Sequence, residues 1–110
     1  MAKRQKTDLL RGTLDLLILK TLALEPLHGV AIADRVAQIT GGTFQVQAGS
    51  LFPALHRLEA DELIIGEWSV VDGRRIKAYA LTGAGRRRLA AETKQWERIV
   101  AAVSQVLRTT

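Results

Sequence analysis

The dipeptide Asp72-Gly73 separates two predicted strands: 63–71, which is rich in β-branched and aromatic residues, and the returning stretch 74–81. A two-residue Asp-Gly connection between such stretches is a strong signal for a tight β-hairpin, because both turn positions favour residues that adopt a positive φ. The sequence therefore predicts an antiparallel hairpin. Arg74 and Arg75 fall beside its tip, where they either present positive charge to a partner or simply keep an edge strand soluble.

The segment before this hairpin predicts a helix, over about 47–62, with one apolar face and one contact face. Leu51, Leu55 and Leu58 recur at i, i+4 and i+7, on one side of a helix, and Pro53 is best tolerated near a helix start because it has no N–H to donate. We expect the contact face to enter the major groove of DNA. Its candidate DNA contacts are Gln47, Ser50, Phe52, Pro53, His56 and Arg57.

A second helix is predicted to begin at His28-Gly29 and to reach about Thr40, where Gly41-Gly42 stops it. Residues 43–46 are expected to be extended, as one short strand. Two helices joined by a short connection that contains glycine outline a helix-turn-helix. His28 is a candidate phosphate contact, or alternatively a structural turn residue beside Gly29.

Several contact candidates keep plainer alternatives. Gln47 and Ser50 lie at a helix N-terminus, where free N–H groups and the helix dipole favour a phosphate, but Ser50 can equally be only a helix cap. Phe52 either touches a thymine methyl group or the DNA backbone, or belongs to the core. His56 and Arg57 either reach a guanine or a phosphate, or lie on a solvated face.

The first and last predicted helices both carry apolar surface beyond what one core needs. Thr7 or Asp8 caps a first helix that ends near Leu24 and has two apolar stripes, whereas a surface helix needs one. Thr82 caps a last helix with a heptad-like seam, which either folds back on its own domain or meets a partner subunit, the interpretation we favour. The expected dimer contacts are Leu9, Leu16, Leu19, Leu89, Trp96, Val100, Val103 and Leu107.

The composition favours an anionic partner and argues against catalysis. The 110 residues carry a net charge of +5, with basic candidates for DNA contact in the N-terminal tail (Arg4 and Lys6) and in the hairpin (Lys77 beside the two arginines). The absence of cysteine excludes disulfides, thiolate catalysis and cysteine metal sites. With two histidines on separate helices, and neither a phosphate-loop motif nor zinc-ligand spacing, we expect no enzyme, cofactor or metal site.

No apolar run approaches the roughly 18 residues of a membrane span. The basic N-terminus is not followed by the apolar core of a signal peptide. We therefore expect a cytoplasmic protein without a membrane partner.

Six segments, taken in order and at their spacing, carry a specific resemblance that covers the chain from about Leu9 to Leu107. They are residues 12–19 (GTLDLLIL), His28-Gly29, residues 49–59 (GSLFPALHRLE), Trp68, Arg74-Arg75 and residues 79–85 (YALTGAG). Together they resemble the PadR-like family of bacterial transcriptional regulators, and look most similar to its short acidobacterial-type members.

This resemblance implies a winged helix-turn-helix homodimer that binds DNA, usually as a repressor, with the last helix packed against the partner's first helix. Three positions depart from the family pattern: Val30 stands where a Tyr or Trp is usual, Phe52 replaces a Tyr, and Ala78 replaces the first of two adjacent Tyr residues. The missing hydroxyl at Phe52 removes a hydrogen bond to phosphate or base, which bears on operator preference more than on DNA binding.

The expected fold is α+β and mainly α, with a basic arm over 1–7, a winged helix-turn-helix DNA-binding domain over 8–81 and a C-terminal dimerisation helix over 82–110. We expect a homodimeric repressor that reads an inverted repeat in double-stranded DNA. Trp96 is expected chiefly to pack the dimer interface, and the alternative is that Trp96 contacts a small-molecule effector that releases the DNA. Two alternatives for the function are a winged-helix module that docks an acidic protein and a sequence-neutral architectural DNA binder. The polar contact face argues against the docking module.

Overall fold

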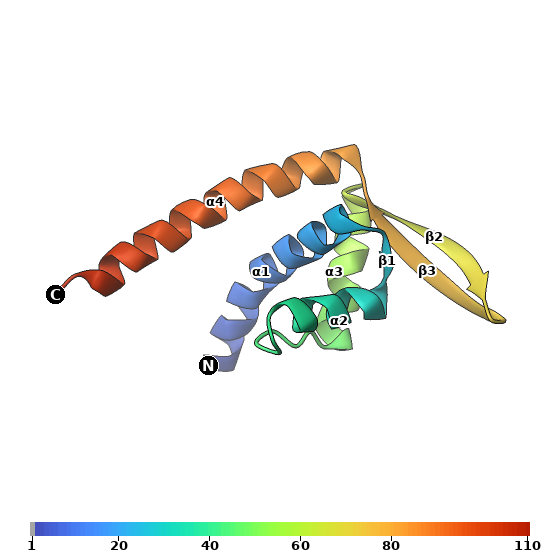
Figure 1. The fold of residues 1–110 in the computed structure, drawn as a ribbon, viewed down its shortest axis with the longest axis horizontal. Helices are drawn as coiled ribbons and strands as arrows, with labels where there is room; N and C mark the ends of the chain where they lie inside the picture. Colours follow the sequence, from blue (N-terminus) through green and yellow to red (C-terminus); the bar gives the residue numbers. More distant parts are fainter. Residues whose placement is uncertain (1) are drawn as a thin grey trace.

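The computed structural model describes residues 2–110, with side chains described from Gly12 onward. The elements follow one another as α1 (Ala2–Leu24), β1 (Leu27–His28), α2 (Gly29–Ile39), α3 (Ala48–Ala60), β2 (Ile64–Val71), β3 (Arg74–Leu81) and α4 (Gly83–Arg108). In Figure 1, α1, α2 and α3 form a cluster, the β2–β3 hairpin projects from it, and α4 runs along the other side. The predicted class, mainly helical α+β with a winged helix-turn-helix and a long last helix, is confirmed.

The β2–β3 hairpin, called the wing below, turns at the predicted dipeptide. Asp72 has φ 52° and Gly73 has φ 77°, so both turn residues are left-handed and the strands pair directly from Val71 opposite Arg74 to Ile64 opposite Leu81. A third strand, β1, pairs with β3 and gives the antiparallel order β1-β3-β2. Two residues are too short for a strand pattern, so the sequence does not predict β1. The short strand expected at 43–46 is wrong, because that segment is irregular.

The core lies where α1, α2 and α3 meet the base of the sheet. The stripe predicted for α3 is confirmed, since Leu51, Leu55 and Leu58 are all buried. The other buried members of this cluster are Ile18, Leu19, Leu22, Ile32, Ala54, Leu63, Ile64 and Tyr79. The core therefore fixes α3 through one face and leaves its opposite face to solvent.

The helix boundaries follow local signals. At the end of α2, the N–H of Gly42 donates to the carbonyl of Ala37 at 2.8 Å and the N–H of Gly41 donates to Gln38 at 3.3 Å. Both glycines have positive φ, 59° and 83°, which completes a Schellman motif. At the start of α4, the Thr82 hydroxyl accepts from the N–H of Gly85 at 3.0 Å, as its predicted capping role requires.

The start of α1 corrects the prediction of an arm over residues 1–7 and a cap at Thr7 or Asp8. The helix already begins at Ala2, because residues 2–7 contain neither proline nor glycine to stop it and are mostly good helix formers. The side chains of Arg4, Lys6 and Leu9 lie outside the described residues.

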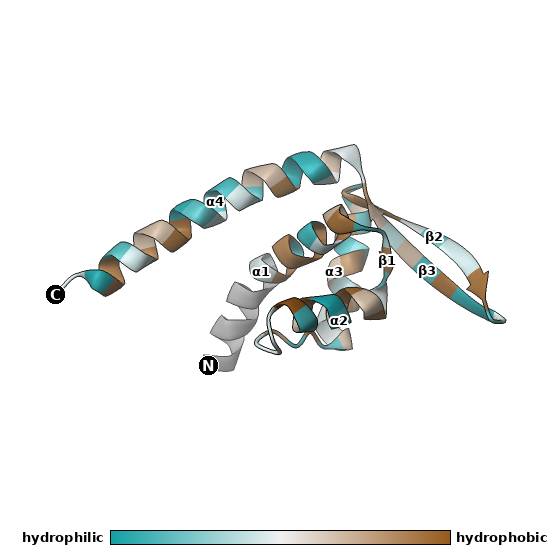
Figure 2. Cartoon of the chain, viewed as in Figure 1, coloured by the Kyte–Doolittle hydropathy of each residue, from teal (hydrophilic) through white to brown (hydrophobic). Residues whose placement is uncertain are grey.

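The last helix makes the chain elongated. The principal extents are 60 × 30 × 25 Å and the radius of gyration is 15.5 Å, against about 13 Å for an ordinary compact chain of this length. The first turns of α4 pack on the core through Ala84 and Leu89. Apolar and polar bands alternate along the rest of α4 (Figure 2). Within the described part of the chain, no helix is long and apolar enough to cross a membrane.

Candidate nucleic-acid interface

The face of α3 opposite its buried leucines is exposed to solvent. Ser50, Pro53 and His56 are all exposed on it. The N-cap position belongs to Gln47, whose side chain makes no capping hydrogen bond, so the alternative role of Ser50 as the cap is wrong. Ser50 instead lies in the first helical turn, where its N–H donates to the Gln47 carbonyl at 3.0 Å. Its hydroxyl and the amide of Gln47 therefore sit at the end of α3 that favours an anion.

Phe52 joins α3 to the start of α2. A Cβ added at Gly29 would come within 3.0 Å of Phe52 Cε1, so the ring lies directly against the first residue of α2. The residue is nevertheless 38% exposed. Phe52 thus has one packed side and one open side, and the two roles considered for it, core residue and DNA contact, are compatible in space.

Arg57 is paired with an acidic residue of α1 in the chain without DNA, and its contact with a guanine or a phosphate stays a prediction. Its Nη2 lies 2.6 Å from Oδ1 of Asp15, and about a third of each side chain remains exposed. The guanidinium therefore points from α3 toward α1. Sequence spacing does not reveal this pair, because 42 residues separate its members.

A cleft lies between the start of α2 and the wing. It is lined by His28, Val30, Arg74, Arg75 and Ile76. His28 is the N-cap of α2, its side chain makes no capping hydrogen bond, and the first turn of the helix contains no acidic residue. His28 also pairs with Ala78 as part of β1, so its backbone is structural while its imidazole is exposed. A helix N-terminus flanked by cations favours a phosphate.

The two wing arginines face opposite sides of the hairpin. Successive residues of a strand alternate in direction, and the strand register places Arg75 opposite Val70 and Arg74 opposite Val71. Arg75 lies over the indole of Trp68, with 4.6 Å between Cζ and the ring centroid. Arg74 therefore belongs to the side of the wing that carries Ile76, and Arg75 to the side that carries Trp68.

Lys77 makes a contact within the chain, and its role as a DNA-binding cation of the wing stays a prediction. Its Nζ lies 2.9 Å from Oε1 of Glu59 on α3, with both side chains largely covered. Oε2 of the same carboxylate accepts the N–H of Gly66 at 3.2 Å. The hydrogen bond from Lys77 lowers the pKa of Glu59 against the opposing effect of burial, and it raises the pKa of Lys77. This bridge ties the wing to α3.

The comparisons with known proteins agree with one another. The model of the "Transcriptional regulator PadR-like family" matches residues 18–91. The transcriptional regulator Rv3488 of Mycobacterium tuberculosis is 36% identical over 89 residues, which are 81% of this chain and 80% of that protein. The crystal structure of a PadR family transcriptional regulator from Eggerthella lenta superposes with a TM-score of 0.82 at 30% identity, covering 99% of this chain and 94% of the other.

The chain belongs to the PadR-like family. A PadR-like transcription factor from Bacteroides fragilis gives the same fold, with a TM-score of 0.78, 28% identity and coverage of 94% of this chain and 98% of that chain. The chain is therefore a DNA-binding transcriptional regulator and not an enzyme, as the sequence predicted.

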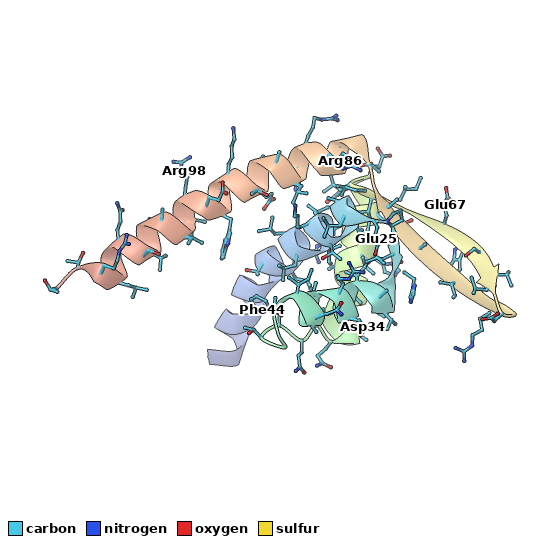
Figure 3. All side chains as sticks on the ribbon, in the orientation of Figure 1. Glu25, Asp34, Phe44, Glu67, Arg86 and Arg98 are labelled. Carbon is cyan, nitrogen blue, oxygen red and sulfur yellow. The ribbon has the colours of Figure 1, made fainter. Side chains whose placement is uncertain are left out.

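In this PadR-like chain, four of the eight residues expected at a dimer interface lie on an uncovered part of α4. Trp96, Val100, Val103 and Leu107 are between 43% and 78% exposed. Arg98, labelled in Figure 3, points from α4 away from α1. It follows Trp96 by two residues in an α-helix, which places it on roughly the opposite side of α4 from the seam. Leu16 and Trp96 line a common cleft between α1 and α4.

Two expected interface residues belong to the chain's own core instead. Leu19 is 1% exposed, and Leu89 packs against the core cluster. The two apolar stripes of α1 have similar compositions, so the sequence does not reveal which leucines pack in the core of the chain itself. The dimer prediction therefore no longer includes Leu19, and Leu89 contributes to it at most through its remaining exposed side.

From sequence alone, Trp68 contributes only to the family resemblance, Val30 is only a departure from the family pattern, and Ile76 has no expected role. All three lie beside the DNA-binding candidates. The signal for Trp68 was available. Once the turn is placed at Asp72-Gly73, direct pairing puts Trp68 opposite Lys77 and diagonal to Arg75. The positions of Val30 and Ile76 depend on how α2 meets the sheet, and local sequence does not specify that.

Proposed function

We propose that this PadR-like regulator is a repressor that acts as a homodimer on an inverted repeat. In each protomer, α3 enters the major groove, while the start of α2 and the wing bind the flanking phosphates. The protein acts in the cytoplasm, where the DNA of a bacterial cell lies. This assignment agrees with the net charge of +5 and with the surface described above.

The observation that carries the proposal is a continuous surface from α3 to the wing. Phe52 on α3 touches Gly29 at the start of α2, and the next residue, Val30, lines the cleft that also contains Arg74 and Arg75. The surface thus runs from α3, the helix proposed to enter the major groove, through the N-terminus of α2 to the two arginines of the wing. Base contacts specify a sequence and phosphate contacts position the protein, and this surface offers groups for both.

The three departures from the usual family residues fall on this same surface. Val30 lines the cleft, Phe52 lies against Gly29, and Ala78 pairs with His28. Each departure substitutes an apolar side chain without a hydroxyl. We infer that this regulator prefers a different operator at the contacted positions, while the cations and the helix N-termini still bind the backbone.

The dimer is supported by the seam on α4. Four apolar side chains of this seam are uncovered in one chain, and burying them needs a partner. With α1 and α4 of two protomers packed together, two copies of α3 are expected roughly 34 Å apart, which matches successive major grooves. The cleft that contains Leu16 and Trp96 is then the candidate site for a small-molecule effector that releases the DNA.

Selection of bound duplexes from a randomised DNA pool at about 150 mM salt tests this function. We expect enrichment of an inverted repeat whose half-sites are about one helical turn apart. Replacing both Arg74 and Arg75 by Ala should weaken binding to every duplex and lower the dependence of affinity on salt, by about 4 units of slope for a dimer if each arginine meets one phosphate.

Other results would change the assignment. Binding without enrichment would point to a sequence-neutral architectural protein. Absence of binding to any duplex, for a folded protein free of ligands, would contradict the DNA interface. Enrichment of a single half-site would retain the interface and contradict the dimer.

A further inference from the structure

Trp68 is a large apolar side chain on an open surface. It is 58% exposed, well outside the core, near the middle of β2. One face of its indole is covered by Arg75, whose Cζ lies 4.6 Å from the ring centroid. Lys77 lies farther away, with Nζ 5.7 Å from the same centroid. The ring therefore serves chiefly as a platform for the guanidinium.

The strand register explains why Arg75 takes this place. Lys77 is directly opposite Trp68, but its ammonium is drawn toward Glu59, 2.9 Å away, and toward the ring of Tyr79, 5.3 Å away. Arg75 is the diagonal neighbour of Trp68 and within reach across the strands. A planar guanidinium stacks well on an indole, where the ring quadrupole attracts the cation.

We propose that Trp68 is a positioning residue for DNA binding, which holds Arg75 in the orientation that meets the DNA. The proposal rests on the proposed contact between the wing and DNA. An arginine that is already stacked has less rotamer freedom to lose when it binds. Stacking uses only the flat face of the guanidinium. The N–H groups at its edge can still donate hydrogen bonds to a phosphate or to a base in the minor groove.

Arg74 provides a matched control. It follows Gly73 directly, is exposed and carries the same charge, but it projects from the other side of the wing, away from Trp68. A change at Trp68 that acts by positioning should therefore affect the contribution of Arg75 and leave that of Arg74 intact. A change that merely disorders the wing would affect both arginines.

The test is a double-mutant cycle in full-length protein, with fluorescence anisotropy on one selected duplex at about 150 mM salt. Arg75→Ala is expected to weaken binding about tenfold in the wild-type background, since two wings act in a dimer. In the Trp68→Leu background the same change should weaken binding less than about twofold. Arg74→Ala should weaken binding equally in both backgrounds. Trp68→Phe, which keeps an aromatic face, should restore most of the affinity lost in Trp68→Leu.

The outcomes separate this proposal from the proposed function. If Arg75→Ala weakens binding equally in the wild-type and Trp68→Leu backgrounds, positioning is overturned and the DNA contact stands. If Arg75→Ala has no effect in the wild-type background, the contact of Arg75 with DNA is overturned, and the positioning proposal with it. If Trp68→Leu tightens binding, the stack competes with DNA, which also overturns the proposal. Thermal unfolding of each variant identifies loss of fold, and Trp68→Gln repeats the cycle if Trp68→Leu is unstable.

Discussion

The guanidinium of Arg57 lies 2.6 Å from the carboxylate of Asp15, so one ion pair joins the last turn of α3 to α1. The helix proposed to read DNA is thereby linked to the helix that lines the cleft with Trp96. Both side chains are about one-third exposed, which places the pair between a solvated contact and a buried one. Its contribution is expected to lie in orientation and stability rather than in a direct contact with DNA.

Replacing Asp15 or Arg57 by Ala should lower the free energy of unfolding. The coupling between the two changes is expected to be about 0.5–1 kcal/mol, measured by urea unfolding of both single variants and the double variant. Because Arg57 is occupied by Asp15, Arg57→Ala should leave the salt dependence of DNA binding unchanged. A fall of about 2 in that slope for the dimer would instead mean that Arg57 leaves Asp15 for a phosphate.

The bridge from Glu59 to Lys77 should make stability depend on pH on the acid side. The hydrogen bond from Lys77 lowers the pKa of Glu59 in the folded chain. Its stabilisation is therefore present above the pKa of the unfolded state and is lost as the pH falls through the lower folded-state pKa. The pKa of Lys77 is raised, so its contribution is lost only in strong alkali.

Glu59→Gln measures this effect, because glutamine keeps an acceptor for the N–H of Gly66. The variant should be less stable than the wild type at pH 7 by at most about 1 kcal/mol, since solvent screens the carboxylate. The difference should shrink steadily below pH 4.5. Thermal unfolding across pH 7 to 3 follows it, and a difference that stays constant with pH would rule out the charge as its origin.

Gly85 lies where α4 passes close to the chain after α3. A Cβ at this position would overlap the carbonyl oxygen of Leu63, a backbone atom that cannot rotate away. Gly85→Ala should therefore destabilise the fold by about 1–3 kcal/mol. Gly83→Ala is the control, because its nearest neighbour is the end of the Arg87 side chain at 3.7 Å. Equal unfolding midpoints for the two variants would contradict the close approach at Gly85.

Val103→Asp should dissociate the proposed dimer without unfolding the protomer. Val103 is half exposed on α4. In a symmetric dimer each protomer would bring one new carboxylate into the apolar seam, so two carboxylates would be buried there. The dimer dissociation constant should rise at least about a hundredfold, as measured by light scattering over a dilution series. Arg98→Ala changes the net charge by the same unit on the opposite side of α4 (Figure 3) and should leave the dimer intact. A dimeric Val103→Asp protein would refute the seam.

The parts of the fold that follow from local rules could be predicted from sequence. Asp72-Gly73 placed the hairpin turn, the leucine spacing of α3 placed its buried face, and Thr82 placed the start of α4. In each case a short stretch of sequence is compatible with only one local structure. The exposure of the α3 contact candidates follows from periodicity, which separates buried from exposed positions. The place of the two arginines in the wing follows from the position of the turn.

The parts that depend on packing between distant elements could not be predicted. Arg57 and Lys77 looked like free cations, and their partners Asp15 and Glu59 lie 42 and 18 residues away in the chain. Leu19 looked like an interface residue because α1 is apolar on more than one side. Nothing local distinguishes a leucine that its own core buries from one that a partner would cover.

The opposite directions of Arg74 and Arg75 make the length of the turn a determinant of function. Arg74 and Arg75 are the same residue type, so neither composition nor net charge distinguishes them. Side chains alternate between the two faces of a strand, so the number of residues from the Asp72-Gly73 turn determines which face each arginine occupies. A single inserted residue in the turn that shifted the register by one would bring the other arginine to Trp68. A variant of this chain with such an insertion is therefore expected to bind DNA differently, even though every basic residue of the wing is retained.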